Sequence, residues 1–320
     1  MIFEKQILKM YKSMAFSRCD DTGLAFYYSS DEFPGLCKEE FTFESSKGHN
    51  LQGYLYYYEN PIEDRLLVFD HGFGGGHRSY MKEIVMLCQR GLRVFAYDHT
   101  GCMRSEGEGA GGMAQSLCDL NDAVCYIKAQ PRFHGCTLSV MGHSWGGFAC
   151  ANIAALHSDI RHIVVLSGFV SVKRLISSFF GGLLAPYRSA VLALEEQYNA
   201  PLLVYDATET LSHADARILL VYSDNDPLCT RRAQYEPLAL ALSHKENVTV
   251  MLEHAKGHNP NYTHAAVGAL ARYARLVRGM HKKKGLSEED KRRFVASFDW
   301  EQITEQDPKV WDAVYRTLGV

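Results

Sequence analysis

The sequence predicts an α/β fold in which helices cover both faces of a mostly parallel central sheet. Short segments that are apolar almost throughout recur along the chain, which is typical of strands buried on both faces. Longer segments with apolar residues at helical spacing separate them, so strands and helices alternate. The chain has 320 residues, 47% of them hydrophobic, enough for one large domain with an insertion. The candidate core strands are residues 65–70, 92–98, 136–141, 160–167, 217–222 and 248–253.

Composition excludes several classes of protein. A net charge of −3 provides no general attraction to nucleic acid or to an anionic membrane. The nine cysteines include no CxxC pair, which is typical of a reducing compartment. We find neither the apolar core of a signal peptide nor an apolar run of membrane-spanning length. We therefore expect a cytoplasmic protein with no membrane span and no nucleic-acid partner.

The chain begins with a predicted helix and a hairpin. Residues 1–17 place apolar side chains at helical spacing, so we expect an amphipathic helix packed on the body. A membrane-surface helix is disfavoured because its polar face mixes Glu with Lys. Residues 39–46 and 51–58 flank a turn, and they predict a hairpin that leads into the sheet.

Two glycine-rich loops follow the first two core strands. The loop His71 to Gly76 lacks both the GK[ST] of a P-loop and the GxGxxG spacing of a dinucleotide fold. Its glycines let backbone N–H groups approach a ligand closely. A helix is expected over 77–90. After the next strand we interpret Asp98 and Arg104 as an ion pair that holds the second loop, rather than as catalytic groups. A helix over 113–130 follows.

The most specific motif is Gly142-His143-Ser144-Trp145-Gly146, a G-x-S-x-G turn between a strand and the helix expected over 146–157. A serine in this tight bend is strained and presents its hydroxyl, and flanking glycines avoid collisions with neighbouring backbone. The Trp145 N–H at the helix start can bind a developing oxyanion. The Phe73 N–H of the first glycine-rich loop is the expected second donor. Ser144 is therefore the candidate nucleophile.

Residues 170–213 interrupt the alternation. No strand fits there, and the segment is too long for a loop in a compact domain. We expect a helical cap over the carboxyl edge of the sheet, divided by Gly181 and Gly182, with Phe179, Phe180 and Leu183 lining an apolar substrate pocket. The predicted core is then 1–169 with 214–280.

The last two core strands each end in a loop with two candidate residues. Asp226 is favoured over Asp224 as the acid, because it lies later in its loop, before a proline. His258 is favoured over His254 as the base, because it follows a flexible Lys-Gly turn that can reach over the elbow. Helices are expected over 232–243 and 262–278, the second of which closes the core.

The remaining candidates are assigned other roles. His71 and His143 flank the oxyanion loops as hydrogen-bonding spacers, and Cys102 has no base beside it. The histidines lack HExxH-like spacing, so we expect neither a metal nor a cofactor. Residues 281–320 are predicted to form two helices that dock on the body, either as a cover for apolar surface or as the arm of a homodimer.

These motifs together resemble the α/β-hydrolase superfamily, closest to its serine esterases, monoacylglycerol-lipase-like enzymes and serine-aminopeptidase-like hydrolases. The resemblance covers about residues 39–280. It rests on the loop at 71–73, the loop at 98–107, the elbow at 142–146, and the order nucleophile, acid, histidine. The departures are Ser223, where the family often has glycine, and the loop Thr100-Gly101-Cys102, which lacks the usual arginine.

The resemblance implies a serine hydrolase that cleaves a carboxylic ester of a small to medium apolar substrate. Ser144 would form an acyl-enzyme, with His258 as base and Asp226 orienting it. An amide or peptide hydrolase, an acyltransferase or a thioesterase could use the same triad. A non-catalytic binding protein is disfavoured because all three triad residues are present. A haloalkane dehalogenase or epoxide hydrolase would need a carboxylate at the elbow.

Overall fold

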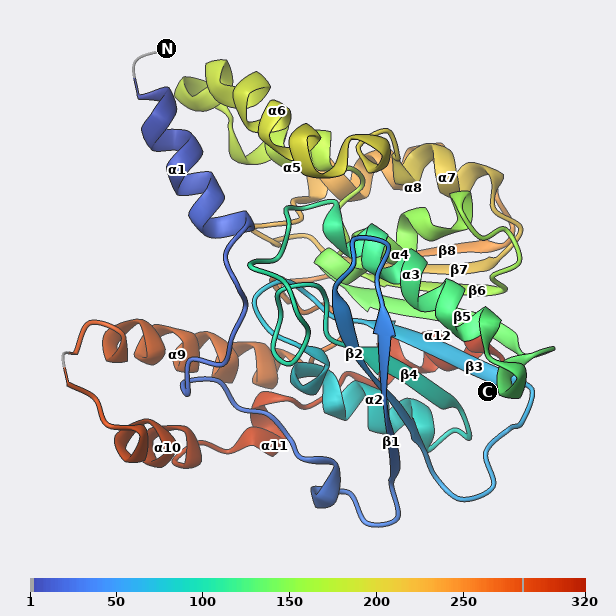
Figure 1. Ribbon diagram of the computed structural model, residues 1–320. Helices are drawn as coiled ribbons and strands as arrows, with labels where there is room; N and C mark the ends of the chain where they lie inside the picture. The colour runs from blue at the N-terminus through green and yellow to red at the C-terminus, as the bar shows by residue number, and fades with distance from the viewer. Residues whose placement is uncertain (1–2, 284) are drawn as a thin grey trace.

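The computed structural model describes residues 3–283 and 285–320. Its strands form one eight-stranded sheet in the order β1-β2-β4-β3-β5-β6-β7-β8 (Figure 1). The hairpin strand β2 pairs antiparallel with β1 and β4, and every pair from β4–β3 to β7–β8 is parallel. The mostly parallel sheet is therefore confirmed. The strands are β1 Cys37–Glu44, β2 Asn50–Tyr57, β3 Arg65–Asp70, β4 Arg93–Tyr97, β5 Thr137–His143, β6 His162–Leu166, β7 Arg217–Ser223 and β8 Val248–Glu253.

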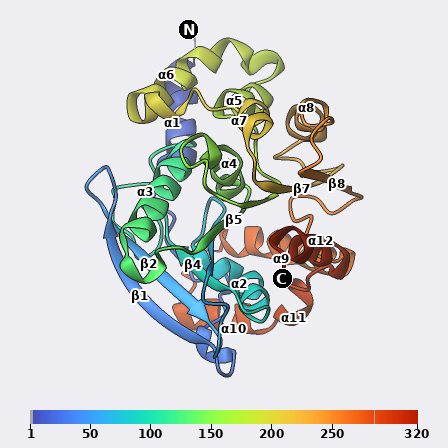
Figure 2. The ribbon, with the colours of Figure 1, turned by 90° about the vertical axis from the view of Figure 1, so that its right-hand side faces the viewer.

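Helices cover both faces of the sheet, as Figure 2 shows, with α3 and α4 on one side and α2 and α12 on the other. Successive residues of a strand point to opposite faces, so Leu66 of β3 packs toward α3 and α4 while Leu67 packs toward α2 and α12. The helices are α1 Glu4–Ala15, α2 Met81–Cys88, α3 Gln115–Ala129, α4 Trp145–Asn152, α5 Val172–Phe179, α6 Arg188–Asn199, α7 Ala207–His213, α8 Glu236–Ala241, α9 His264–Met280, α10 Glu288–Ala296, α11 Trp300–Ile303 and α12 Pro308–Leu318.

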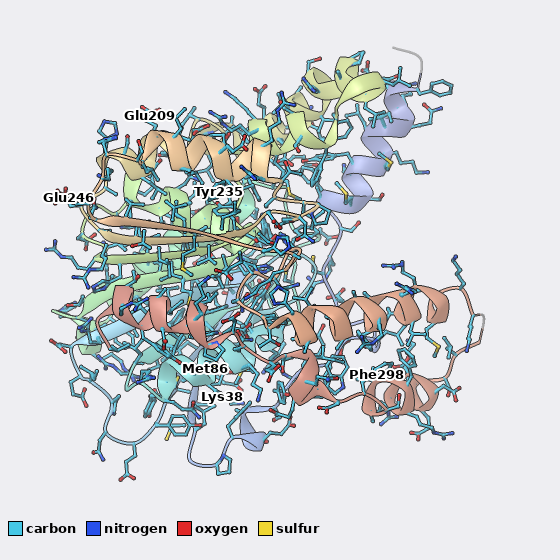
Figure 3. The ribbon with its side chains drawn as sticks, turned by 180° about the vertical axis from the view of Figure 1, so that it is seen from behind. Lys38, Met86, Glu209, Tyr235, Glu246 and Phe298 are labelled. Atoms are coloured by element: carbon cyan, nitrogen blue, oxygen red, sulfur yellow. The ribbon has the colours of Figure 1, made fainter. Side chains whose placement is uncertain are left out.

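The helix that closes the core is α12, and not the helix predicted over 262–278. The buried side of α12 lies against β6 and β7, with Trp311 and Val314 in the core. Helix α9 instead packs with α11, where Ala269, Tyr273 and Ile303 form a separate hydrophobic cluster. Phe298, labelled in Figure 3, packs against this cluster. Six residues of the 11-residue α12 are buried, against three in the 17-residue α9, in agreement with the place of α12 on the sheet.

The C-terminal extension contains three helices rather than the predicted two. The short α11 begins at Trp300, after the N-cap Asp299, whose side chain accepts the Gln302 N–H, and it separates α10 from α12. Because α12 fills the sheet face of its own chain, the structure uses this segment as a cover for apolar surface.

The N-terminal helix packs on the body as predicted, with Tyr11 and Ala15 in the main core, and it also lies beside α6 (Figure 1). The prediction began at residue 1, and residues 1–2 lie outside the described part of the chain. Tyr11 of α1 is buried and donates a 2.5 Å hydrogen bond to the Glu195 carboxylate of α6. In the segment predicted as a cap, α5 and α6 are separated at Gly181 and Gly182, whereas α7 packs on α4. The boundaries of the cap remain a prediction.

The expected ion pair between Asp98 and Arg104 is wrong. Asp98 is buried, where it accepts hydrogen bonds from the backbone N–H of His77 at 3.0 Å and from its ring Nδ1 at 2.8 Å. Arg104 faces solvent and pairs with Glu40 at 3.1 Å. The buried carboxylate thus binds the N-terminal end of the segment before α2, while the guanidinium stays hydrated.

Among the described helices, none combines the length and the apolar character that crossing a bilayer requires.

Candidate active site

Ser144 lies in the turn between β5 and α4 with φ 55° and ψ −109°. A side chain rarely adopts a positive φ, and the strain costs on the order of 1–3 kcal/mol. Two backbone hydrogen bonds hold the turn: the Ser144 N–H donates to Leu166 at 2.9 Å, and the Ser144 carbonyl accepts from Phe148 at 2.9 Å. The strand and the helix on either side therefore impose the strained conformation that presents the hydroxyl.

The glycines of the motif are required by the close approach of neighbouring backbone. A Cβ atom on Gly146 would lie 2.2 Å from the carbonyl oxygen of Asp70, at the end of β3. A Cβ atom on Gly142 would lie 2.5 Å from the carbonyl oxygen of Gly146. No backbone atom can yield without moving the strand or the helix, so the elbow requires both glycines.

We expect Gly146→Ala to lower the free energy of unfolding by about 3 kcal/mol, since it forces a side chain into packed backbone. The matched control is Gly268→Ala within α9, where the added Cβ would meet only the Arg272 side chain at 3.7 Å. That change should be neutral or stabilising by up to about 1 kcal/mol. Urea unfolding of both variants checks this, and equal stabilities would contradict the close approach.

Asp226 and His258 meet beyond the carboxyl ends of the neighbouring strands β7 and β8. His258 Nδ1 lies 2.7 Å from one carboxylate oxygen of Asp226, and the other oxygen accepts the N–H groups of Leu228 at 2.8 Å and Cys229 at 3.0 Å. Burial opposes the charge of Asp226, but these bonds and the imidazole outweigh it and lower its pKa. The carboxylate is therefore ionised and held in one orientation toward the histidine.

The other ring nitrogen of His258 is free for a reacting group. His258 Nε2 is buried, and within the described residues it has no hydrogen-bond partner. The His258 carbonyl accepts a hydrogen bond from His143 Nε2 at 2.7 Å, and the centroids of the two rings lie 4.8 Å apart. Because His143 precedes Ser144, these contacts bring the loop of His258 to the turn that carries Ser144.

The alternatives that the sequence left open form a separate pair. His254 Nδ1 lies 2.6 Å from the Asp224 carboxylate, and the His254 side chain is 85% exposed. Cys102 is fully buried. The structure thus pairs Asp226 with His258 beside the elbow and leaves Asp224 with His254 at the surface.

Phe73 and Trp145 come together next to Ser144. Their rings pack edge to face with centroids 5.0 Å apart, and all three residues line one cavity. Among the described residues, no acceptor takes the backbone N–H of Phe73 or of Trp145. Both donors are therefore available to a ligand at the elbow.

A hydrogen-bonded chain that the sequence did not reveal connects the three loops. The Gly72 N–H donates to the Tyr80 hydroxyl at 3.1 Å, and that hydroxyl lies 2.8 Å from His143 Nδ1. Burial lowers the pKa of His143 to about 3, so its ring is neutral. Since Nε2 donates to the His258 carbonyl, Nδ1 accepts from Tyr80. His143 thus acts as a spacer with both nitrogens engaged, and His71 likewise bonds the Gly72 carbonyl and the His99 N–H.

The neutral state of His143 predicts a pH dependence of stability. An unfolded histidine titrates near pH 6.5, whereas folded His143 titrates near pH 3, so below pH 6.5 the unfolded chain binds the extra proton. The part of the free energy of unfolding that depends on neutral His143 is complete above pH 6.5. It is lost as the pH falls toward 3, by up to about 1.4 kcal/mol per pH unit. In guanidinium unfolding, stability should therefore fall less between pH 7 and pH 5 in His143→Gln than in wild type. Equal losses of stability in wild type and His143→Gln would contradict this pH dependence.

The cavity at Ser144 has a volume of about 170 Å³ and an almost entirely apolar lining. Of the three predicted pocket residues, Phe179 lines it. The other two do not: Phe180 is buried against Tyr11, with ring centroids 6.0 Å apart, and Leu183 is 96% exposed. Because α5 ends at Phe179, the following residues turn away from the cavity. The lining comprises Tyr11, Met14, Phe73, Met113, Ser144, Trp145, Phe169, Leu175, Ile176, Phe179, Leu228 and Cys229.

Sequence reasoning missed the contribution of α1 to this cavity. Tyr11 and Met14 lie in its wall, and Glu195, which accepts the Tyr11 hydroxyl, also accepts the Met113 N–H at 3.0 Å. The apolar face of α1 was visible in the sequence, but its partner was not. The carboxylate of Glu195 thus joins the N-terminal helix, the cap and the loop before α3.

The C-terminal extension supports the histidine loop. Lys256, two residues before His258, is 1% exposed, and its ammonium bonds the Asp307 carboxylate at the start of α12. The same ammonium lies 3.5 Å from Glu253 and 3.4 Å from the Pro260 carbonyl. Residues far from the motifs therefore anchor the loop that carries His258.

Two groups of three side chains have donor atoms within 4.8 Å of one another, the spacing of a metal site: Asp226, Cys229 and His258, and Cys118, Asp119 and Asp122. In the first group the Asp226 carboxylate and His258 Nδ1 already bond each other. In the second group Asp119 accepts from Thr100 and Gln115, and Asp122 accepts from Ser46. Protein donors thus occupy the carboxylates of both groups.

The comparisons with known proteins agree with this architecture. Residues 62–194 match the family model of serine aminopeptidase, S33. The chain is similar to an esterase of Pyrococcus furiosus, Pf2001, at 14% identity and a TM-score of 0.58, over 84% of this chain and 100% of that one. An acetyl xylan esterase from Paenibacillus sp. R4 matches at 17% identity and 0.56, over 88% and 93%. A puromycin-hydrolyzing peptidase of Mycobacterium tuberculosis matches at 17% and 0.53, over 69% and 36%.

The fold is the α/β-hydrolase fold, and the resemblance found in the sequence is confirmed. The matched family segment runs from before β3 into α6, and thus contains the elbow and both glycine-rich loops. The family and these structural neighbours are hydrolases, in agreement with the site's arrangement at the carboxyl edge of the sheet.

Proposed function

We propose that the protein is a serine hydrolase that cleaves a carboxylic ester with a small to medium apolar acyl group through an acyl-enzyme on Ser144. The observation that carries the proposal is the Asp226–His258 pair at 2.7 Å beside a strained serine turn, with His258 Nε2 unpartnered among the described residues. A carboxylate that orients an imidazole, and an imidazole that activates a serine, constitute the machinery of acyl transfer.

The proposed mechanism has two steps. His258 Nε2 takes the Ser144 proton as the hydroxyl oxygen attacks the ester carbonyl, and Asp226 stabilises the imidazolium that forms. The N–H groups of Phe73 and Trp145 bind the oxyanion, each contributing on the order of 3 kcal/mol. His258 then protonates the leaving alcohol, and it activates a water molecule that hydrolyses the acyl-enzyme.

The cavity supports a modest acyl group. Its volume of about 170 Å³ is close to that of an engineered apolar protein cavity of about 150 Å³ that holds benzene. The apolar lining presents no charged side chain to the acyl group. We therefore propose an acyl chain of roughly four to eight carbons, because a benzene-sized space holds about six.

A series of p-nitrophenyl esters from acetate to palmitate tests the proposal. We expect kcat/KM to be highest for roughly four to eight carbons and at least about tenfold lower for palmitate, because a long chain cannot enter the cavity. Equal or faster turnover of palmitate would contradict the proposed size.

Amide hydrolysis is the second candidate, favoured by the serine aminopeptidase family match and by the peptidase among the structural neighbours. Amino-acid p-nitroanilides, measured beside the esters, distinguish the two. Faster turnover of the anilides would replace ester hydrolysis by amide hydrolysis, while the proposed triad would stand.

We propose a cytoplasmic location from the cysteine usage, in agreement with nine unpaired thiols. A homodimer remains a prediction.

A further inference from the structure

The segment after α1 runs alongside the loop that follows β4. The Cys19 N–H donates to the Gly101 carbonyl at 2.9 Å, and the Cys19 carbonyl accepts from Met103 at 3.1 Å, so that Cys19 pairs with Cys102 in a parallel bridge. Adjacent strands lie about 4.8 Å apart. A disulfide spans Cα atoms about 4.4–6.8 Å apart. The backbone therefore holds these two cysteines at a separation that a disulfide can bridge.

The two side chains also lie on the same side of this bridge, because residues opposite each other in a parallel pair project in the same direction. The interaction between the two thiols lowers the pKa of Cys19 and raises that of Cys102. Cys102 is fully buried, whereas 7% of Cys19 remains exposed. Cys19 is therefore the more accessible residue of the pair.

The surroundings of Cys19 favour its thiolate. The hydrogen bond from Cys102 is the largest influence on its pKa; burial opposes it, and the Gly74 N–H and the nearby His99 add to it, so that the pKa falls to about 7. The lowered pKa favours the Cys19 thiolate, and the thiolate is the reactive form.

We propose that Cys19 and Cys102 form a reversible disulfide when the protein meets a hydroperoxide. The Cys19 thiolate attacks the terminal oxygen of the O–OH group, the S–O bond forms as the O–O bond breaks, and the other oxygen leaves as alkoxide (hydroxide from hydrogen peroxide), which makes Cys19 a sulfenic acid. The Cys102 sulfur then attacks the Cys19 sulfur; the S–S bond forms, the S–O bond breaks, and water leaves with the thiol proton. The two sulfurs lose two electrons in total, and the peroxide gains them. A dithiol reductant reverses the reaction and becomes a disulfide itself.

The position of the pair connects it to the site. Gly74 follows Phe73, whose N–H is a proposed oxyanion donor, and the Gly74 N–H favours the Cys19 thiolate that disulfide formation removes. The disulfide also ties the segment after α1 to the loop at Cys102, and Tyr11 and Met14 of α1 line the cavity. Oxidation should therefore lower ester turnover; this consequence rests on the proposed function, whereas the disulfide itself does not.

The test treats the 320-residue protein with about one equivalent of hydrogen peroxide. The remaining free thiols are then alkylated, the protein is digested, and the peptide masses are measured by mass spectrometry. We expect a peptide pair linked through Cys19 and Cys102, lighter by two hydrogens than the separate thiols and released by dithiothreitol. Cys19 should react at least about tenfold faster than the exposed Cys37 and Cys125. Preferential oxidation of those exposed cysteines without the linked pair would overturn the proposal.

Variants separate the steps. In Cys102→Ser, Cys19 should stop at the sulfenic acid, which dimedone traps, and in Cys19→Ser no linked pair should form; Cys125→Ser is the matched control and should behave as wild type. Circular dichroism checks the folding of each variant, and the wild-type measurement stands without them. A disulfide that forms and leaves ester turnover unchanged would overturn the link to the oxyanion loop, but not the disulfide. An enzyme inactive on every ester when reduced would contradict the proposed function alone.

Discussion

Ser144→Ala is expected to lower kcat for the best p-nitrophenyl ester by about a million-fold, because triad residues act as a unit and removal of the nucleophile disables all of them. The fold should persist, since alanine and serine tolerate the φ of 55° about equally. Steady-state kinetics on purified protein, with circular dichroism as a folding check, measures the effect.

Ser167→Ala is the matched control. Ser167 is also a buried serine with a positive φ of 47°, and its hydroxyl has no hydrogen-bond partner in the described structure. It lies after β6 rather than at the elbow, so its replacement should change kcat by less than about tenfold, the scale of one modest interaction. If the two variants retain similar activity, the assignment of Ser144 as nucleophile is wrong.

Asp226→Asn is expected to lower kcat by about a thousand- to ten-thousand-fold. The amide preserves the shape of the carboxylate, but it cannot stabilise the imidazolium and it favours the wrong tautomer of His258. Since the pKa of Asp226 lies below its ordinary value, wild type keeps this charge throughout the neutral range. The stabilisation of the ion is complete above the unfolded carboxyl pKa and is lost as the pH falls through the lowered value.

Asp224→Asn provides the comparison within the same loop. Asp224 bonds His254, whose side chain is 85% exposed, so this change should alter kcat by less than about twofold, because exposed pairs contribute little. Kinetics of both variants across pH 5–9 decide between the two acids. A larger loss from Asp224→Asn would reverse their roles.

The predictions from the sequence succeeded where a local pattern carries the physical cause. Apolar segments of strand length identified the core strands, because strands covered on both faces carry mostly apolar side chains. The elbow was recognisable because its glycines are required sterically: a Cβ atom on Gly146 would clash with the backbone of Asp70. The structure likewise brings Asp226 and His258 to 2.7 Å, as expected for loops that follow neighbouring parallel strands.

The predictions failed where a choice of partner was required. Asp98 and Arg104 have opposite charges in one loop, yet burial selects His77 for Asp98, and solvent exposure leaves Arg104 to Glu40. Leu183 is as apolar as the residues that line the cavity, but the chain turns after α5 and exposes it. Periodicity identifies an apolar face, and it does not identify what that face will meet.

The sequence by itself determined the class of fold, the strand–turn–helix motif around Ser144, and the loops that carry Asp226 and His258, because each depends on residues close together in the chain. Only the tertiary structure decided that α12 closes the core, that Tyr11 walls the cavity, and that Lys256 bonds Asp307 beneath the histidine loop. These contacts join segments far apart in the chain, and their free energy depends on how well two surfaces fit once the sheet has formed. No local pattern encodes that fit.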